Sequence, residues 1–89
     1  MRTIHKYALE ITDRQTVTFP SPAVVLDVQF QDGKLVLWAV VDTDGDRPQT
    51  MTVRIFGTGA PFDGDGHTYL STVQDDRTSL VWHVFGRGN

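Results

Sequence analysis

The sequence predicts an all-β domain, a small antiparallel β-sandwich or barrel of about seven strands. Apolar residues alternate with polar ones or form short β-branched and aromatic runs, and clusters of Gly, Pro and Asp separate these segments. No window repeats its apolar residues with the 3.6-residue period of a helix. Short strands with such turn signals are typical of sandwiches and small barrels. The 89 residues suit a single domain, which we place over 1–89.

The strands follow in chain order from this pattern. Two short runs open the chain, and a longer pair flanks Asp32-Gly33, a two-residue type I′ turn in which Gly tolerates positive φ. Alternation of Met51, Val53 and Ile55 with polar neighbours indicates the next strand, and a turn at Asp75–Thr78 separates the last two. We expect strands over 3–11, 15–19, 23–31, 34–42, 50–57, 67–74 and 79–86.

The Asp32-Gly33 turn also predicts the register of its hairpin, because it sets Gln31 opposite Lys34. The predicted core face pairs Phe30 with Leu35, Val28 with Leu37, Leu26 with Ala39, and Val24 with Val41. The opposite face pairs Gln29 with Val36, Asp27 with Trp38, and Val25 with Val40. Burying one Val or Trp is worth roughly 1.5–3 kcal/mol. We therefore expect this second face to be covered by another strand layer, a second copy of the chain, or a ligand.

The last hairpin is predicted in the same way from a four-residue turn at Asp75–Thr78. This turn would pair Val73 with Leu80, Ser71 with Trp82, and Tyr69 with Val84, and it would place Leu70, Val81, His83 and Phe85 on the other face. Small Ser71 would then leave room for bulky Trp82.

Composition narrows the functional classes. The net charge is −3, the pI is about 5.4, and the eight Lys and Arg residues are scattered. A nucleic-acid polymer is therefore a disfavoured partner, because such proteins need a basic footprint. The chain has no cysteine, no apolar segment of membrane-spanning length and no signal-peptide pattern at its start. We expect a cytoplasmic protein without a membrane partner.

The glycine- and aspartate-rich loops allow two interpretations each. Gly57-Thr-Gly59 is either a glycine bend or a backbone nest for an anion, and it lacks the Gly-Lys-Ser/Thr of a phosphate-binding P-loop. Carboxylates at Asp42, Asp44 and Asp46 alternate as calcium ligands would, with Asp63 and Asp65 in the other long loop. The bidentate Glu of a calcium loop is missing, and Asp-Gly steps are common in turns. We predict neither a metal nor a cofactor.

Candidate binding residues lie on the faces turned away from the core. Arg54 suits a phosphate or carboxylate, and aromatic rings stack on bases. Alternatively, Arg54 pairs with Asp27 on a neighbouring strand. The predicted ligand-binding set is Arg54, Gly57, Thr58, Gly59, Trp38, Tyr69 and His83. Neither Ser71 nor Ser79 has the context of a catalytic nucleophile, so we predict that the protein is not an enzyme.

Four segments carry a resemblance to a family of small uncharacterised proteins of tailed phages, mostly of actinobacterial hosts. They are residues 1–7 (MRTIHKY), 36–42 (VLWAVVD), 54–59 (RIFGTG) with Pro61, and 80–85 (LVWHVF). The family pattern has a histidine before that proline, where this chain has Ala60. The resemblance implies a phage accessory protein in the host cytoplasm, which counters host defences by blocking a protein or sequestering a nucleotide signal.

Two functional hypotheses follow. The first is a self-associating, non-enzymatic β-sandwich that binds a small anionic ligand such as a nucleotide immune signal. The second is a protein-interaction module without a small-molecule site, either an inhibitor of a host defence protein or a virion accessory, whose Val25, Val36, Trp38 and Val40 contact another chain.

Overall fold

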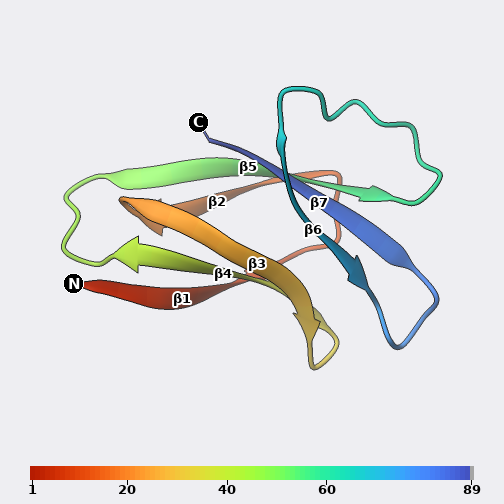
Figure 1. Ribbon diagram of the computed structural model, residues 1–89, viewed down its shortest axis with the longest axis horizontal. Helices are drawn as coiled ribbons and strands as arrows, with labels where there is room; N and C mark the ends of the chain where they lie inside the picture. The colour runs from red at the N-terminus through yellow and green to blue at the C-terminus, as the bar shows by residue number, and fades with distance from the viewer. Residues whose placement is uncertain (89) are drawn as a thin grey trace.

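The computed structural model describes residues 1–88 and contains seven antiparallel strands in two sheets (Figure 1). The strands are β1 (Arg2–Leu9), β2 (Arg14–Pro20), β3 (Ala23–Gln31), β4 (Lys34–Asp42), β5 (Pro48–Gly57), β6 (Thr68–Gln74) and β7 (Val81–Gly88). The all-β prediction is confirmed, and no predicted boundary is displaced by more than about two residues. None of the described residues 1–88 forms a helix able to cross a membrane.

One sheet has the strand order β1-β4-β3 and the other has the order β2-β5-β7-β6. The chain changes sheet between β1 and β2, between β2 and β3, and again between β4 and β5. The edge strands β3 and β6 contact each other across the two sheets, and Figure 1 shows them side by side near the middle of the molecule. This arrangement is a small β-sandwich.

The core lies between the inner faces of the two sheets. Both sheets contribute because the side chains of a strand alternate between its faces. An edge-to-face contact between Tyr7 and Phe19, with ring centroids 4.8 Å apart, joins β1 to β2 across the sheets. The largest fully buried side chains are Phe19, Val28, Leu37, Val41, Val53, Val73 and Val84.

The turn between β3 and β4 has the predicted geometry. Asp32 and Gly33 both have positive φ, 52° and 78°, as a type I′ turn requires. The register is also the predicted one from Gln31–Lys34 as far as Asp27–Trp38. The register of the half of this hairpin that adjoins the turn was therefore predictable from Asp32 and Gly33 alone.

Beyond Asp27 the predicted register is wrong, because β3 contains a bulge at Leu26. One extra residue in β3 shifts the pairing to Val25–Ala39, Val24–Val40 and Ala23–Val41. Val25, expected on the outer face, packs against the core instead. Val24 and Leu26, expected in the core, are 57% and 51% exposed.

The predicted register of the last hairpin is also wrong. Val73 pairs with Trp82 and Ser71 pairs with Val84, because the connecting loop extends to residue 80 and leaves Leu80 exposed. A second bulge, between Tyr69 and Ser71, then pairs Tyr69 with Phe85 and turns Leu70 towards the core. This bulge directs the Tyr69 ring to the outer face of the four-stranded sheet.

Candidate functional site

The outer face of the four-stranded sheet carries the candidate site. Buried Val53 and Ile55 point into the core from β5, so Thr52, Arg54 and Phe56 lie on the opposite face. Each of these three residues is paired with a residue of β7. The pairs are Thr52 with Arg87, Arg54 with Phe85, and Phe56 with His83.

The loop between β5 and β6 folds back over this face. Its Phe62 ring lies 4.8 Å from the ring of Phe56 and 5.1 Å from that of Phe85, measured between centroids. Phe56 and Phe85 contact each other edge to face at 5.8 Å, and Tyr69 contacts Phe85 at 5.6 Å. Such aromatic pairs add about 0.5–1.5 kcal/mol each beyond the area they bury. The four rings hold the loop on the sheet.

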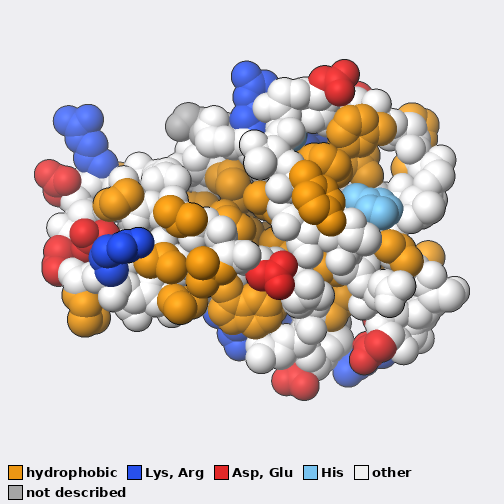
Figure 2. All heavy atoms as spheres, viewed as in Figure 1, with side chains coloured by type: hydrophobic (Ala, Val, Ile, Leu, Met, Phe, Trp, Pro, Cys, Tyr) orange, Lys and Arg blue, Asp and Glu red, His pale blue; other side chains and the backbone are white. Residues whose placement is uncertain are grey.

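A hollow of about 280 Å³ lies beside these rings. It is lined by Phe56, Gly57, Thr58, Gly59, Ala60, Phe62, Tyr69, His83 and Phe85, which we call the aromatic hollow. Figure 2 shows hydrophobic side chains gathered beside a histidine in the part of this view where β6, β7 and the loop after β5 lie. Apolar rings with a few hydrogen-bonding groups are the usual lining of a small-molecule site.

A chain of hydrogen bonds runs along the hollow. The Oγ1 of Thr58 is 2.8 Å from Nε2 of His83, and Nδ1 of the same ring is 3.1 Å from Oγ1 of Thr72. The Thr72 hydroxyl is in turn 2.8 Å from the Tyr69 hydroxyl. Both nitrogens of His83 are therefore held by neutral hydroxyl groups, which fix the orientation of the ring.

The glycines after β5 form the rim of the hollow. The Ala60 amide donates to the Gly57 carbonyl at 3.1 Å and closes a tight turn. Gly59 has a φ of 90°, which a residue with a side chain rarely adopts. The glycine bend, one of the two interpretations of this segment, is therefore part of the wall of the hollow.

Arg54 lies beside the hollow but does not line it. Its buried guanidinium donates from Nε to the Asp13 carbonyl at 3.0 Å, and from Nη2 to carboxylate oxygens of Asp13 at 3.0 Å and Asp63 at 2.7 Å. It also lies 4.9 Å from the centroid of the Phe56 ring. The Arg54–Asp27 pair considered above does not form, since the ion pairs of Arg54 are with Asp13 and Asp63.

These bonds shift the pKa values of the groups involved. The Arg54 guanidinium holds the pKa of Asp63 below its usual value, mainly by donating a hydrogen bond to the carboxylate and further by its charge. Conversely, the Asp13 and Asp63 carboxylates raise the pKa of Arg54. The guanidinium is thus committed to two carboxylates and anchors the loop.

Of the seven residues predicted for the site, five line the hollow: Gly57, Thr58, Gly59, Tyr69 and His83. Arg54 supports the hollow from the side. Trp38 does not join it, because it lies on the outer face of the other sheet, opposite Lys6 of β1 and Asp27 of β3. Convergence of the five depends on strand order, since β5, β7 and β6 are neighbours in the sheet.

Sequence reasoning missed Phe62 and Thr72 as parts of the site. Phe62 stands alone between turn-forming residues, where a large apolar side chain must find its contacts outside a strand. That isolation was the available signal for Phe62. Thr72 had no signal, because its role depends on the register of β6 against β7.

The aspartates of the loop between β4 and β5 are occupied by local contacts. Asp42 and Asp44 both pair with the N-terminal ammonium group, and the Asp44 amide donates to the Asp42 carboxylate at 3.0 Å. Within residues 1–88, no three acidic or histidine side chains converge to hold a metal ion.

A family model described as a domain of unknown function (DUF7352) matches residues 1–89. The chain belongs to this family. Neither the curated proteins nor the solved structures gave a match to the chain. The membership covers the whole sequence, so the aromatic hollow and its rim lie inside the family domain.

Proposed function

We propose that the protein is a binding module for a small anionic ligand of nucleotide type, whose flat ring enters the aromatic hollow. The observation that carries the proposal is the convergence of four aromatic rings with the Thr58–His83 hydrogen bond around one small hollow. A nucleobase offers a π-face for stacking and polar edges for hydrogen bonds. The Thr58 hydroxyl supplies a hydrogen-bonding partner at the edge of such a ring.

We propose binding rather than catalysis. A nucleophile and base need a third group that orients the base and stabilises its positive charge. His83 is oriented by the Thr72 hydroxyl, which carries no charge. The arrangement therefore supports recognition of a ligand better than activation of the Thr58 hydroxyl.

The biological setting of this proposal comes from the resemblance to tailed-phage proteins. In that setting the protein acts in the host cytoplasm as a phage accessory that sequesters a nucleotide immune signal. A sequestering protein needs affinity without turnover, which agrees with a hydrogen-bonded but uncharged His83 environment. The proposed role is drawn by analogy with small tailed-phage proteins.

Calorimetry tests the ligand class. Adenosine and adenosine diphosphate are titrated into the wild-type protein and into Phe62→Ala, with Phe30→Ala as a control that removes a ring elsewhere. We expect heat of binding with the wild type and with the control, and a loss of binding in Phe62→Ala. Equal binding by both variants would show that the aromatic hollow is not the binding site.

We also propose that the protein associates with itself through the outer face of the three-stranded sheet. Ile4, Val24 and Leu26 are 58%, 57% and 51% exposed there, beside half-buried Trp38 and Val40. Figure 2 shows hydrophobic side chains gathered where β1, β3 and β4 lie. Exposed apolar patches of this kind mark contacts with other molecules.

Charge favours a second copy as the occupant. Lys6 and Asp27 lie on opposite sides of Trp38, so a two-fold axis that lies over Trp38 and runs parallel to the strands would set Lys6 of each protomer against Asp27 of its partner. A face that is complementary to itself is what an isologous dimer requires.

Light scattering tests this second proposal. We expect a dimer mass for the wild type, a monomer for Val24→Lys, and a dimer for Ile11→Lys, which adds the same charge at an exposed apolar residue outside this face. A wild-type monomer at high concentration would overturn self-association. Capture of a different protein by the same face would favour the protein-interaction module instead.

A further inference from the structure

We propose that Arg14, His67 and Arg87 form an oxyanion site that receives the phosphate group of a phosphorylated ligand. The three side chains surround a second hollow, of about 320 Å³, on the same outer face as the aromatic hollow. Thr52 and Gly88 complete its lining. We call it the basic hollow.

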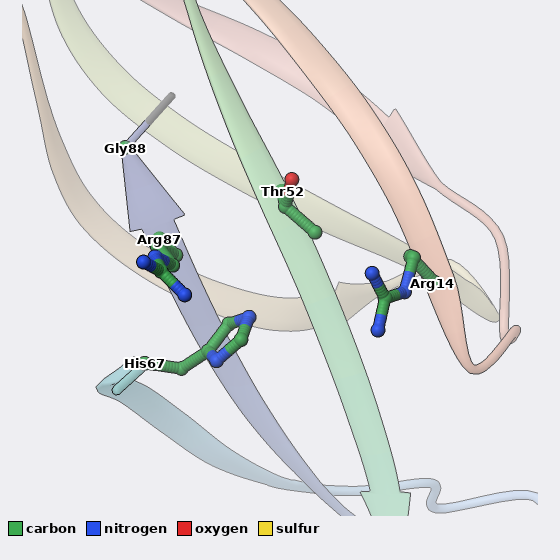
Figure 3. A pocket seen from close by; sticks show the side chains of 5 residues that line it. All are labelled: Arg14, Thr52, His67, Arg87 and Gly88. Carbon is green, nitrogen blue, oxygen red and sulfur yellow. The ribbon is translucent and has the colours of Figure 1, made fainter. Parts of the chain in front are cut away.

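Topology brings the two arginines together although 73 positions separate them in the sequence. Arg14 begins β2, and Arg87 lies near the end of β7, with β5 between them. Arg14 is paired with Arg54 and Arg87 with Thr52, so the two arginines lie two strands apart and two residues apart along β5. At about 4.8 Å between strands and about 3.4 Å per residue, their backbones are about 12 Å apart. Figure 3 shows the Arg14 guanidinium pointing towards β5 from one side, with Arg87 and His67 on the other. Two long side chains can therefore reach one group above Thr52.

Charge supports an anionic occupant. The ion pairs found within residues 1–88 use Arg54 and the N-terminal ammonium group as their cations, so neither Arg14 nor Arg87 takes part in one. Arg14 helps to lower the pKa of Asp63, but that carboxylate is already paired with Arg54. A guanidinium binds phosphate oxygens with two parallel hydrogen bonds.

The His67 ring supplies an independent observation. Its Nδ1 is buried and has no hydrogen-bond partner within the described part of the chain, while its backbone amide donates to the Gly64 carbonyl at 3.0 Å. A buried polar atom of this kind calls for a partner, because leaving it unpaired is unfavourable. Figure 3 shows the ring among the residues that line the basic hollow. A phosphate oxygen in the hollow would accept a hydrogen bond from this nitrogen once the ring turns it towards the hollow and the nitrogen carries a proton.

The two hollows lie at a spacing that fits one ligand. Thr52 lines the basic hollow and Phe56 lines the aromatic hollow, four residues apart on β5. Four residues of a strand span about 13 Å. A ring in one hollow and a phosphate in the other would be the two ends of a nucleotide whose middle passes over Arg54, which lies between Thr52 and Phe56 and is paired with Asp13 and Asp63. The oxyanion site stands on its own residues, whereas this assignment to one ligand rests on the proposed function.

Titration with inorganic pyrophosphate, adenosine and adenosine diphosphate tests the site. The variants are Arg14→Gln, Arg87→Gln and, as a matched control, Arg47→Gln in the exposed loop between β4 and β5. We expect pyrophosphate binding to weaken about 10- to 100-fold in the first two variants, the effect of losing a charged hydrogen-bonded contact, and to be unchanged in the control. Adenosine binding should be the same in all four proteins.

The outcomes separate the two proposals. Pyrophosphate binding that Arg14→Gln and Arg87→Gln leave intact, or that the wild type lacks, would overturn the oxyanion site whatever adenosine does. Pyrophosphate binding that depends on both arginines supports the site, even where adenosine does not bind and the aromatic hollow fails. Tighter binding of adenosine diphosphate than of either part, lost in Arg87→Gln, supports a single ligand across both hollows.

Discussion

Arg54 of β5 donates a 2.7 Å hydrogen bond from Nη2 to Oδ1 of Asp63, and so fastens the middle of the loop between β5 and β6 to the sheet beneath it. The neighbouring Phe62 ring packs on Phe56 and Phe85, which lie on that sheet. The ion pair and the ring contacts thus act on adjacent residues of one loop. The shape of the aromatic hollow depends on both.

Removal of the Asp63 carboxylate should loosen the loop without unfolding the domain. In Asp63→Ala we expect faster amide hydrogen exchange over residues 58–67 and weaker adenosine binding, because the anchor on Arg54 is lost. The β3 and β4 amides should exchange at the wild-type rate. Asp65→Ala, an exposed acidic residue of the same loop, is the control. Equal exchange in both variants would show that the ion pair does not hold the loop.

The same pair should make stability depend on pH. Arg54 lowers the pKa of Asp63 in the folded protein below its ordinary value of about 3.9. The contribution of Asp63 is therefore fully present above that value and is lost as the pH falls through the lowered folded pKa. At neutral pH we expect the free energy of unfolding to be larger for the wild type than for Asp63→Asn.

Urea denaturation of both proteins between pH 2 and pH 7 measures the difference. The pKa of Asp42 is also lowered, mainly by the hydrogen bond from the Asp44 amide, but that contribution is common to the two proteins and cancels. The difference should shrink only in the most acidic part of the range. A difference that is constant with pH would contradict the assignment to the Arg54–Asp63 pair.

The bulge in β3 predicts unequal effects from two leucines of the same hairpin. Leu37 is fully buried, so Leu37→Ala should cost about 2–5 kcal/mol of unfolding free energy. Leu26 is half exposed, so Leu26→Ala should change stability by about 0.5 kcal/mol or less in the monomer. Chemical denaturation at low protein concentration measures both. Similar large losses in both variants would show that Leu26 is buried, as the register without a bulge requires.

Much of the fold could be predicted because its signals are local. The Asp32-Gly33 turn has a conformation that few residue pairs favour, and it alone set the register up to Trp38. The bulges at Leu26 and Leu70 could not be predicted, because one extra residue leaves the apolar composition of a strand unchanged. What decides them is packing between the sheets.

The candidate site was predictable in composition but not in geometry. Gly57, Thr58, Gly59 and Tyr69 are close in sequence, and their loop drew attention through its glycines. The placement of His83 beside Thr58 depends on β7 lying between β5 and β6. Arg14 and Arg87 gave no signal, because only the sheet order makes them neighbours.

The hydroxyl of Thr58 should contribute to ligand binding through His83. Thr58→Val removes the 2.8 Å hydrogen bond to Nε2, whereas Thr58→Ser keeps a hydroxyl there. We expect adenosine affinity to fall about 2- to 10-fold in the first variant and to be preserved in the second. Nitrogen NMR shifts of the His83 ring should move in Thr58→Val alone. Unchanged ring shifts in both variants would show that the Thr58 hydroxyl does not bond to the His83 ring.

The most direct measurement is an amide NMR titration of the wild-type protein with adenosine diphosphate. Shift changes should concentrate at Gly57, Thr58 and Gly59, with His83 and Arg87 on the adjoining strand, while Val24 and Leu26 on the other sheet stay still. Changes confined to the Trp38 face, or no changes at saturating ligand, would contradict a binding site on the outer face of β2-β5-β7-β6.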